Sequence, residues 1–453
     1  MAGMVTMTDE QRVLPHTTRR DPRGFLTLGT VPLTVLALRY GTPLYLYDDE
    51  HLRGALWQWR RAFNSRLPKP ASFSISYAAK AFLCLGIAQL IAEEGAGMDV
   101  NSGGEMHIAL AGGVPAAHIH LHGNAIPADE LRAVIDKGIG RIAIDNLPEL
   151  DAVNQIAGTL GKRQEIWLRL NPGVEAHTHA AMATGHLDSK FGLPIETGDA
   201  ARAVRAALAA PHLDLRGFHA HIGSSIADPE TYRETVRRLM RFAAAMHAET
   251  GWTMAECSPG GGFGVRYLPD DPLLSPDDAA DAVIGTLITE CAAAGLPVPD
   301  VTIEPGKALV APAAIALYRV VNVKDVPGVR RFVAVDGGMA DNIRPALYGA
   351  RYLVLLANRV SSAETMPATV VGRYCESGDI LARDVPLPAD IEAGDLLAFP
   401  TAGAYAVPMS SQYNGVPRPA IVLVREDGTH QLLRRRETYD DLLRHDLPLD
   451  EIP

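Results

Sequence analysis

Between about residues 72 and 311 the sequence changes eight times from a short apolar run to a longer segment with helical spacing. We interpret the apolar runs as strands. Seven of them lie at residues 72–77, 97–101, 119–122, 141–145, 165–170, 215–221 and 301–304, and the remaining one, seventh in chain order, is a run that reaches Cys257. Strands and helices that alternate with short connections are typical of parallel βαβ units. Eight such units predict a closed (β/α)8 barrel, whose functional residues lie at the C-terminal ends of the strands.

After residue 311 this alternation ends. Short β-rich runs separated by Gly and Pro predict an antiparallel β domain, either a sandwich or a barrel. The run at 42–47 precedes the barrel and needs a sheet, so we expect it to join this domain. We therefore expect three parts: an arm and strand at 1–47, loose up to about residue 23, a barrel at 48–311, and a β domain at 312–453.

Charge and cysteine content limit the classes of function. The net charge of -11 argues against a nucleic acid or an anionic membrane as partner. Four cysteines without CxxC spacing are too few for a disulfide framework, which favours a reducing cytoplasm, and they indicate no metal site. No run is apolar enough for a signal peptide or a membrane helix, so we expect a soluble, cytoplasmic protein.

Several predicted strands are followed by residues that could react with a substrate or bind a ligand. Lys80 follows the first strand, where an apolar cleft would lower the pKa of its ammonium and free the amine to attack a carbonyl. Gly260, Gly261 and Gly262 follow the seventh, where backbone N–H groups can cradle a phosphate. Ser224 lies just past the sixth strand and can add a hydroxyl to the same anion.

Two further strand ends complete this constellation. His219 and His221 alternate to the same side of the sixth strand, and an imidazole there could stack on a flat ring. Glu304 ends the eighth strand and needs a cationic partner, which a protonated pyridine nitrogen or Arg169 would supply. Together with Lys80 this pattern indicates a pyridoxal-phosphate site. A phosphosugar enzyme with a covalent lysine would leave Glu304 without a role.

The chain from about residue 42 to 425 resembles the diaminopimelate decarboxylase family of fold-type III pyridoxal-phosphate-dependent decarboxylases. The stretches that carry the resemblance are Tyr77-Ala-Ala-Lys80-Ala-Phe82, Ser102-Gly-Gly-Glu105, His122-Gly-Asn124, Ser189-Lys-Phe-Gly192, His219-Ala-His-Ile-Gly-Ser224, Gly260-Gly-Gly262, Glu304-Pro-Gly306, Asp336-Gly-Gly-Met339, Ile343-Arg-Pro-Ala-Leu-Tyr348, Cys375-Glu-Ser-Gly-Asp379 and Gly403-Ala-Tyr405.

The resemblance implies how pyridoxal 5'-phosphate would be held. Lys80 would carry the cofactor covalently, His221 would stack on its ring and Glu304 would bind the pyridine nitrogen, while Ser224, Gly262 and Tyr405 would hold the phosphate. The residues expected to bind the cofactor are Lys80, Arg169, His221, Ser224, Gly261, Gly262, Glu304, Gly306 and Tyr405.

The resemblance also implies a head-to-tail homodimer with active sites shared across the interface. Cys375 would enter the partner subunit's site as proton donor, and Glu376 would bind the distal ammonium of the substrate. Arg344 and Tyr348 would bind the distal carboxylate, a task for which a guanidinium is suited. The expected catalytic residues are therefore Lys80 and Cys375, and the expected substrate-binding residues are Lys307, Arg344, Tyr348, Glu376 and Tyr405.

The implied reaction is decarboxylation of meso-2,6-diaminopimelate to L-lysine and CO₂. Two positions depart from the family pattern: Lys307 replaces the usual arginine and loses its bidentate geometry, and Ala125-Ile126 replaces a more polar pair. The alternatives are a related decarboxylase that acts on another amino acid or a carrier-bound acid in secondary metabolism, a non-catalytic regulatory homologue, and a racemase.

Overall fold

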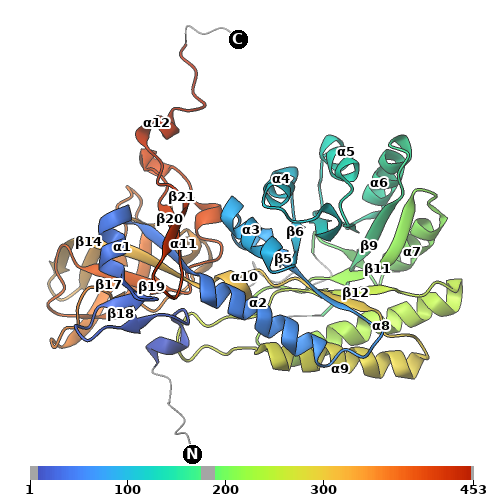
Figure 1. Cartoon of the computed structure of the whole chain (residues 1–453), viewed down its shortest axis with the longest axis horizontal. Coiled ribbons are helices and arrows are strands. Elements are labelled where there is room, and N and C mark those ends of the chain that lie inside the picture. Colours follow the sequence, from blue (N-terminus) through green and yellow to red (C-terminus); the bar gives the residue numbers. More distant parts are fainter. Residues whose placement is uncertain (1–8, 175–188, 450–453) are drawn as a thin grey trace, which may run out of the picture. The chain divides into compact units, whose positions relative to one another are not determined.

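The computed structural model describes residues 9–174 and 189–449. The chain forms two compact units (Figure 1). Residues 53–265 and 272–309 make up the barrel unit, and residues 1–52, 266–271 and 310–453 make up the sheet unit. Among the described residues no helix is both long and apolar enough to cross a membrane.

The barrel unit contains eight parallel strands that close on themselves. They are β5 (Phe73–Ala78), β6 (Gly97–Val100), β7 (Ile119–His122), β8 (Arg141–Ile144), β9 (Gln164–Asn171), β11 (Leu213–Ala220), β12 (Glu256–Gly260) and β13 (Asp300–Ile303). Closure comes from the pairing of β13 with β5 and of β8 with β9. The predicted closed barrel is thus confirmed. A short additional strand, β10 (Leu193–Pro194), pairs with the end of β9.

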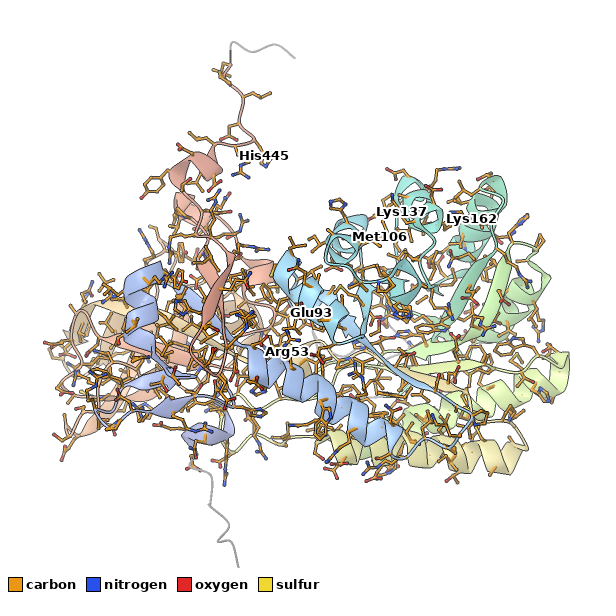
Figure 2. All side chains as sticks on the ribbon, in the orientation of Figure 1. Arg53, Glu93, Met106, Lys137, Lys162 and His445 are labelled. Atoms are coloured by element: carbon orange, nitrogen blue, oxygen red, sulfur yellow. The ribbon has the colours of Figure 1, made fainter. Side chains whose placement is uncertain are left out.

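Helices surround the strands on the outside of the barrel, and Figure 1 shows α4, α5 and α6 side by side there. The helices are α2 (Asp49–Asn64), α3 (Leu85–Glu93), α4 (Gly103–Ala111), α5 (Ala128–Lys137), α6 (Leu147–Thr159), α7 (Asp199–Ala209), α8 (Pro229–Thr250), α9 (Pro276–Ala294) and α10 (Lys307–Val310). Side-chain N-caps fix where four of them begin, because Ser102, Asn146, Asp228 and Ser275 accept first-turn N–H groups. Surface ion pairs such as Arg53 with Glu93 join neighbouring helices (Figure 2).

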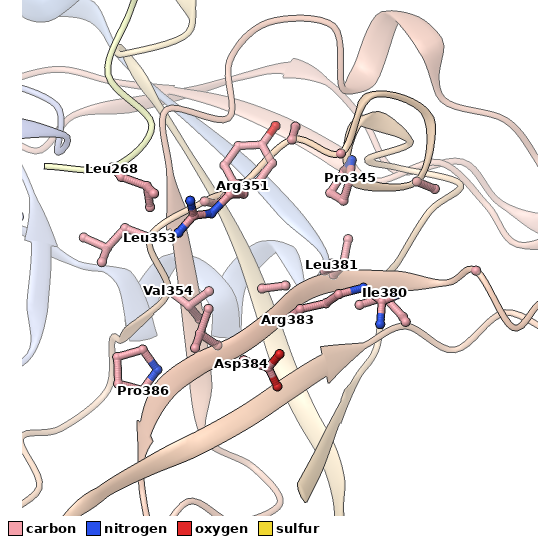
Figure 3. A pocket seen from close by; sticks show the side chains of 17 residues that line it. Leu268, Pro345, Arg351, Leu353, Val354, Ile380, Leu381, Arg383, Asp384 and Pro386 are labelled. Carbon is pink, nitrogen blue, oxygen red and sulfur yellow. The ribbon is translucent and has the colours of Figure 1, made fainter. Parts of the chain in front are cut away.

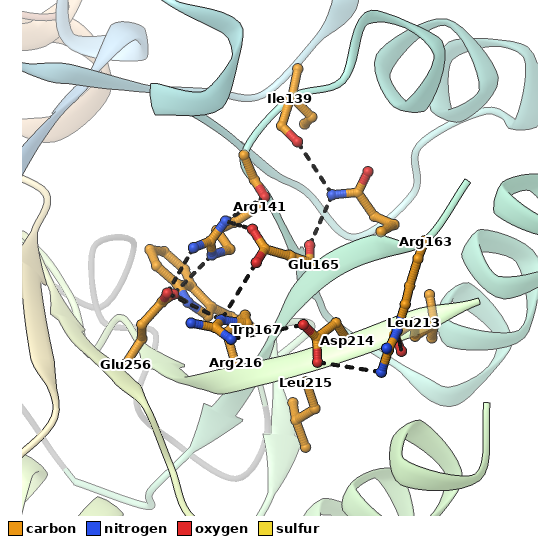
Figure 4. Close-up of polar contacts among 12 residues, drawn as sticks. Ile139, Arg141, Arg163, Glu165, Trp167, Leu213, Asp214, Leu215, Arg216 and Glu256 are labelled. Atoms are coloured by element: carbon orange, nitrogen blue, oxygen red, sulfur yellow. Dashed lines mark hydrogen bonds and ion pairs between the residues drawn. The ribbon is translucent and has the colours of Figure 1, made fainter. Parts of the chain in front are cut away.

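An ion-pair network ties together the N-terminal ends of several barrel strands (Figure 4). Arg141 of β8 binds Glu256 of β12 with 2.7 Å between Nη2 and Oε1, and it also pairs with Glu165 of β9. The indole N–H of Trp167 donates to the same Glu256 at 2.7 Å. Polar residues at this end of a parallel barrel serve stability, whereas the opposite end carries function.

The sheet unit is built on β14 (Ala314–Val326), which pairs antiparallel with β4 (Leu44–Asp48), β15 (Arg330–Val335) and β19 (Leu396–Pro400). The expected entry of an N-terminal strand into this sheet is confirmed by β4. The other strands are β16 (Leu355–Leu356), β17 (Thr365–Val371), β18 (Ile380–Pro388), β20 (Ala420–Val424) and β21 (His430–Arg434). The sheet is mixed rather than wholly antiparallel, because β4–β20 and β15–β17 are parallel pairs of strands that no hairpin joins.

The expectation of a loose arm is wrong for residues 9–23. After η1 (Glu10–Arg12), β1 (Arg19–Arg20) pairs with β2 (Leu26–Leu28), and β2 pairs with β3 (Val31–Pro32), ahead of α1 (Leu33–Tyr40). The backbone N–H and the hydroxyl of Thr17 each donate to Asp48 Oδ2 at 2.9 Å. Val13 and Leu14 are buried, so a segment of polar composition is attached through a few specific contacts.

Candidate active site

Lys80 lies at the C-terminal end of β5, in the single turn η2 (Ala79–Ala81). The turn directs the chain away from the strand, and the lysine side chain is exposed rather than enclosed in an apolar cleft. Desolvation by the surrounding protein nevertheless lowers the pKa of Lys80, and the positive charge of Arg169 lowers it further, against the opposing effect of Glu304.

Glu304 follows β13 and is buried among groups from other strands. Its Oε1 accepts the hydroxyl of Ser258 at 2.7 Å, and its Oε2 lies 2.9 Å from His219 Nε2. The Nε2 atom of His122 lies 3.9 Å from Oε1. Burial raises the pKa of Glu304, but the two histidines outweigh it and hold the pKa below its usual value. The carboxylate is therefore ionised and still has accepting capacity.

The two histidines of β11 differ in environment. His219 is fully buried and its pKa is lowered by burial, so the neutral ring can donate from Nε2 to Glu304. His221 follows the end of the strand and is half-buried. Burial places the pKa of His221 well below its ordinary value, and the charges of Lys80 and Arg169 add to this effect. A neutral imidazole is the form that stacks on an aromatic ring without a charge penalty.

A second carboxylate, Asp99 at β6, lies next to this group and was not among the predicted site residues. Its Oδ1 accepts the Ser76 hydroxyl at 2.6 Å and lies 3.5 Å from both His120 Nδ1 and His122 Nε2. Burial raises the pKa of Asp99, but His122 and His120 outweigh it and hold the pKa low. The alternation of His120 and His122 on β7 was the sequence signal that could have pointed to them.

The glycines after β12 and β13 allow the loops at the strand ends to approach one another. Gly262 has φ of +87°, and a Cβ there would lie 2.1 Å from the carbonyl oxygen of Gly223. A Cβ on Gly261 would lie 2.0 Å from the Glu304 carbonyl oxygen, and one on Gly306 would lie 2.9 Å from Ala78 Cβ. Only glycine fits at the first two positions, which leaves the backbone unshielded for an anion.

Lys307 begins α10 and is buried beside this glycine-rich group. Its Nζ donates to the Ser224 hydroxyl at 2.9 Å and also to the Ser225 hydroxyl. The structure thus brings the predicted residues Lys307 and Ser224 together. Glycine backbone, a serine hydroxyl and an ammonium form a donor set that fits a phosphate group, and Glu304 fits a protonated ring nitrogen.

Arg169 lies near the end of β9, and it is buried. Its Nη1 lies 3.8 Å from Asp145 Oδ1, and its guanidinium lies 4.4 Å from the ring centroid of Phe191. Its ion pair is therefore with Asp145, whereas Glu304 is held by His219 and Ser258 instead.

Arg344 and Tyr348 begin and end α11 (Arg344–Tyr348) in the sheet unit. Arg344 is buried, donates to the Tyr352 hydroxyl at 2.6 Å and lies 4.6 Å from the ring centroid of Tyr267. Within the described residues no carboxylate lies at ion-pair distance from it. A buried guanidinium whose neighbours are tyrosines retains its attraction for an added carboxylate.

The remaining predicted residues also belong to the sheet unit. Cys375 is exposed, and its backbone N–H donates to Asn414 Oδ1 at 2.9 Å. Glu376 is also exposed and accepts the Gly378 N–H at 3.2 Å. Tyr405 is half-buried and has a left-handed backbone with φ of 57°. Such a conformation is costly for a bulky residue and often marks a functional position.

A cavity of about 490 Å³ lies in the sheet unit between the segment after α11 and strand β18 (Figure 3). Arg351, Leu353, Arg383 and Asp384 contribute to its lining. None of the predicted site residues lines this cavity.

Comparison with known proteins defines the class first. Residues 51–311 match the model of the pyridoxal-dependent decarboxylases, in particular of their pyridoxal binding domain. This is the region that contains the strand ends described above.

Proteins that are similar to nearly the whole chain identify the family within this class. The chain is 44% identical to the diaminopimelate decarboxylase of Mycobacterium tuberculosis over 95% of this chain and 97% of that protein. It is 41% identical to the Bacillus subtilis diaminopimelate decarboxylase, over 96% and 98% of the two chains. The crystal structure of diaminopimelate decarboxylase from M. jannaschii with L-lysine matches with a TM-score of 0.89 at 33% identity, covering 96% of this chain and 98% of that one. The chain therefore belongs to the diaminopimelate decarboxylase family, which are carboxy-lyases.

Proposed function

We propose that the protein uses pyridoxal 5'-phosphate to decarboxylate meso-2,6-diaminopimelate to L-lysine and CO₂. The observation that carries the proposal is the ionised Glu304, held by His219 and Ser258 at strand ends that also present Lys80. The bound cofactor supplies an electron sink for the electron pair left when CO₂ departs. Family membership and full-length similarity to diaminopimelate decarboxylases support this substrate.

The proposed roles of the barrel residues follow from their chemistry. Lys80 holds the cofactor through its amine, and its lowered pKa increases the neutral, nucleophilic fraction. Neutral His221 offers a ring face, and Glu304 offers a charged oxygen to the pyridine nitrogen. Ser224, Gly261, Gly262 and Gly306, with Tyr405 and Arg169, complete the proposed cofactor-binding set.

The sheet-unit residues would select the substrate. Arg344 and Tyr348 bind the distal carboxylate, which distinguishes diaminopimelate from lysine, ornithine and arginine. The buried guanidinium with tyrosine neighbours supports this role. Glu376 would bind the distal ammonium.

We further propose a homodimer in which Cys375 and Glu376 enter the partner subunit's site. Both side chains are exposed in the single chain, as residues that act on another subunit must be. Cys375 would donate the proton that replaces the lost carboxyl group.

Lys307 favours one alternative: a related decarboxylase in secondary metabolism. The lysine is engaged with Ser224 and Ser225, so the contact with substrate that is expected of the usual arginine is less direct. Arg344 argues against this alternative because it still offers a site for a distal carboxylate.

The test is release of CO₂, with identification of the product, from protein loaded with pyridoxal 5'-phosphate. The substrates are meso-diaminopimelate, L-lysine, L-ornithine and L-arginine. We expect L-lysine from diaminopimelate and little CO₂ from the other three. Turnover of one of those three, with none of diaminopimelate, would reject the proposed substrate.

A further inference from the structure

His122 occupies a position between two buried carboxylates of the barrel unit. Its Nε2 lies 3.5 Å from Asp99 Oδ1 and 3.9 Å from Glu304 Oε1. The atom is buried and makes no hydrogen bond within the described residues. One imidazole nitrogen therefore faces two like charges that come from different strands.

Two carboxylates this close to one another repel, and burial raises the cost of ionising both. Asp99 raises the pKa of Glu304, and the two histidines lower it. His219 is neutral and acts as a hydrogen-bond donor, so it cannot supply a full positive charge. A protonated His122 lies at ion-pair distance from both carboxylates, so its charge acts on both of them at short range.

The surroundings of His122 support its protonated form. The charged and titratable groups that face it are Asp99 from β6, Glu304 after β13, Arg169 from β9, His219 and His221 from β11, and Glu149 from α6. Burial lowers the pKa of His122 and Arg169 also lowers it, but Glu304 and Asp99 outweigh them and the pKa is raised.

We infer that His122 is a positioning residue that keeps Glu304 ionised against Asp99, so that Glu304 can bind the ring nitrogen of the cofactor. This inference rests on the cofactor of the proposed function but not on the identity of the substrate. Without the imidazolium, Glu304 would take up a proton more readily and lose its attraction for a protonated ring nitrogen.

His120 provides a matched control. It lies on the same strand, and its Nδ1 is also 3.5 Å from Asp99 Oδ1, but no contact of ion-pair length joins it to Glu304 within the described residues. His122→Asn and His120→Asn therefore remove the same side chain from β7 and differ in their effect on Glu304.

The probe is pyridoxine 5'-phosphate, which has the ring nitrogen and the phosphate but no aldehyde to react with Lys80. Its dissociation constant is measured by calorimetry on the cofactor-free full-length chain at about pH 6.5 and about pH 8.5. Inorganic phosphate serves as a second probe, which reports only on the glycine, Ser224 and Lys307 donors. At each pH the dissociation constants of the two variants are compared as a ratio, because the effect of the ligand's own titration is the same for both and cancels.

We expect His122→Asn to bind pyridoxine 5'-phosphate about tenfold or more weakly than His120→Asn at the lower pH, because loss of one buried charge partner costs at least this factor. The difference in affinity for pyridoxine 5'-phosphate between the two variants should be smaller at the higher pH, because Glu304 is ionised there without the help of His122. Phosphate binding should be the same in both variants. Equal binding of pyridoxine 5'-phosphate by the two variants would overturn the inference. A loss of phosphate binding in His122→Asn as large as its loss of pyridoxine 5'-phosphate binding would also overturn it.

The double variant Asp99→Asn/His122→Asn keeps the test informative if His122→Asn folds poorly. It removes the repelling charge together with the imidazole, so it should bind pyridoxine 5'-phosphate nearly as well as His120→Asn. A double variant that binds as weakly as His122→Asn, or more weakly, would show that His122 acts only through packing. Decarboxylation of diaminopimelate by the wild type is tested separately. Rejection of the proposed substrate would therefore not reject the role of His122, and rejection of that role would not reject the substrate.

Discussion

At the scale of single residues, Glu304 depends on partners that come from other strands. Ser258 and His219 occupy both of its oxygens, and neither partner is close to it in sequence. A sequence can place Lys80, Glu304 and the glycines at strand ends, because all parallel strands of a barrel end at one edge. It could not show that Ser258 and His122 turn toward Glu304, because that depends on register between strands.

Replacement of Ser258 by Ala should therefore lower the stability of the fold and the affinity for the cofactor. The hydroxyl donates to Glu304 at 2.7 Å and accepts the Gly260 N–H at 3.2 Å, and its loss leaves buried groups unsatisfied. We expect a loss of about 1–3 kcal/mol in the free energy of unfolding. Urea denaturation measures it, and titration with pyridoxal 5'-phosphate measures the weaker binding.

Ser74→Ala is the matched control for this change. Its hydroxyl pairs with Thr302 Oγ1 at 2.8 Å, and within the described residues no hydrogen bond joins Ser74 to Glu304. Cofactor affinity should stay close to that of the wild type. If Ser258→Ala and Ser74→Ala affected cofactor binding equally, the role given to Ser258 would be wrong.

At the scale of elements, the segment at residues 9–23 joins the sheet unit through buried polar contacts. The ring of His16 stacks on His51 with centroids 3.9 Å apart, and the His16 N–H donates to His51 Nδ1 at 3.2 Å. The apolar run at 42–47 predicted β4 because its residues favour strands. The preceding segment has no such pattern, since its attachment rests on individual side chains, and this is why it was expected to be loose.

The contact with His51 predicts a pH dependence of stability. Burial lowers the pKa of His51 from 6.5 to about 3, so the unfolded chain takes up a proton there in this interval and the folded chain does not. The contribution of neutral His51 to the free energy of unfolding is complete above pH 6.5. It declines as the pH falls, by about 1.4 kcal/mol per pH unit at most.

His51→Gln keeps an acceptor for the His16 N–H but does not titrate. Urea unfolding of the wild type and of this variant, at pH values from about 7 to about 5, compares the two slopes. We expect the variant to lose less stability on acidification. Parallel curves would mean that His51 is not held neutral in the folded state.

At the scale of the whole molecule, residues of both units have roles in the proposed function. The closed barrel and the entry of an N-terminal strand into the second sheet were predictable from the alternation of patterns along the chain. The mixed pairing in that sheet was not, because strands such as β4 and β20 are far apart in sequence and local patterns do not determine their direction. The proposed sharing of residues between subunits comes from family resemblance.

Mixing two inactive variants tests that sharing. Lys80→Ala lacks the cofactor-binding amine, and Cys375→Ala lacks the proposed proton donor. If each site takes Cys375 from the partner subunit, a mixed dimer has one intact site, and random exchange should restore about a quarter of the wild-type rate of L-lysine formation. Absence of recovery after verified subunit exchange would place both residues in the same subunit's site.

The most direct test of the central claim is to locate the lysine that carries the cofactor. Protein loaded with pyridoxal 5'-phosphate is reduced with borohydride, digested, and mapped by mass spectrometry. We predict that the modified peptide contains Lys80, which lies at the end of β5. Modification at Lys307, the buried lysine of the same unit, or the absence of any specific modification, would contradict the account.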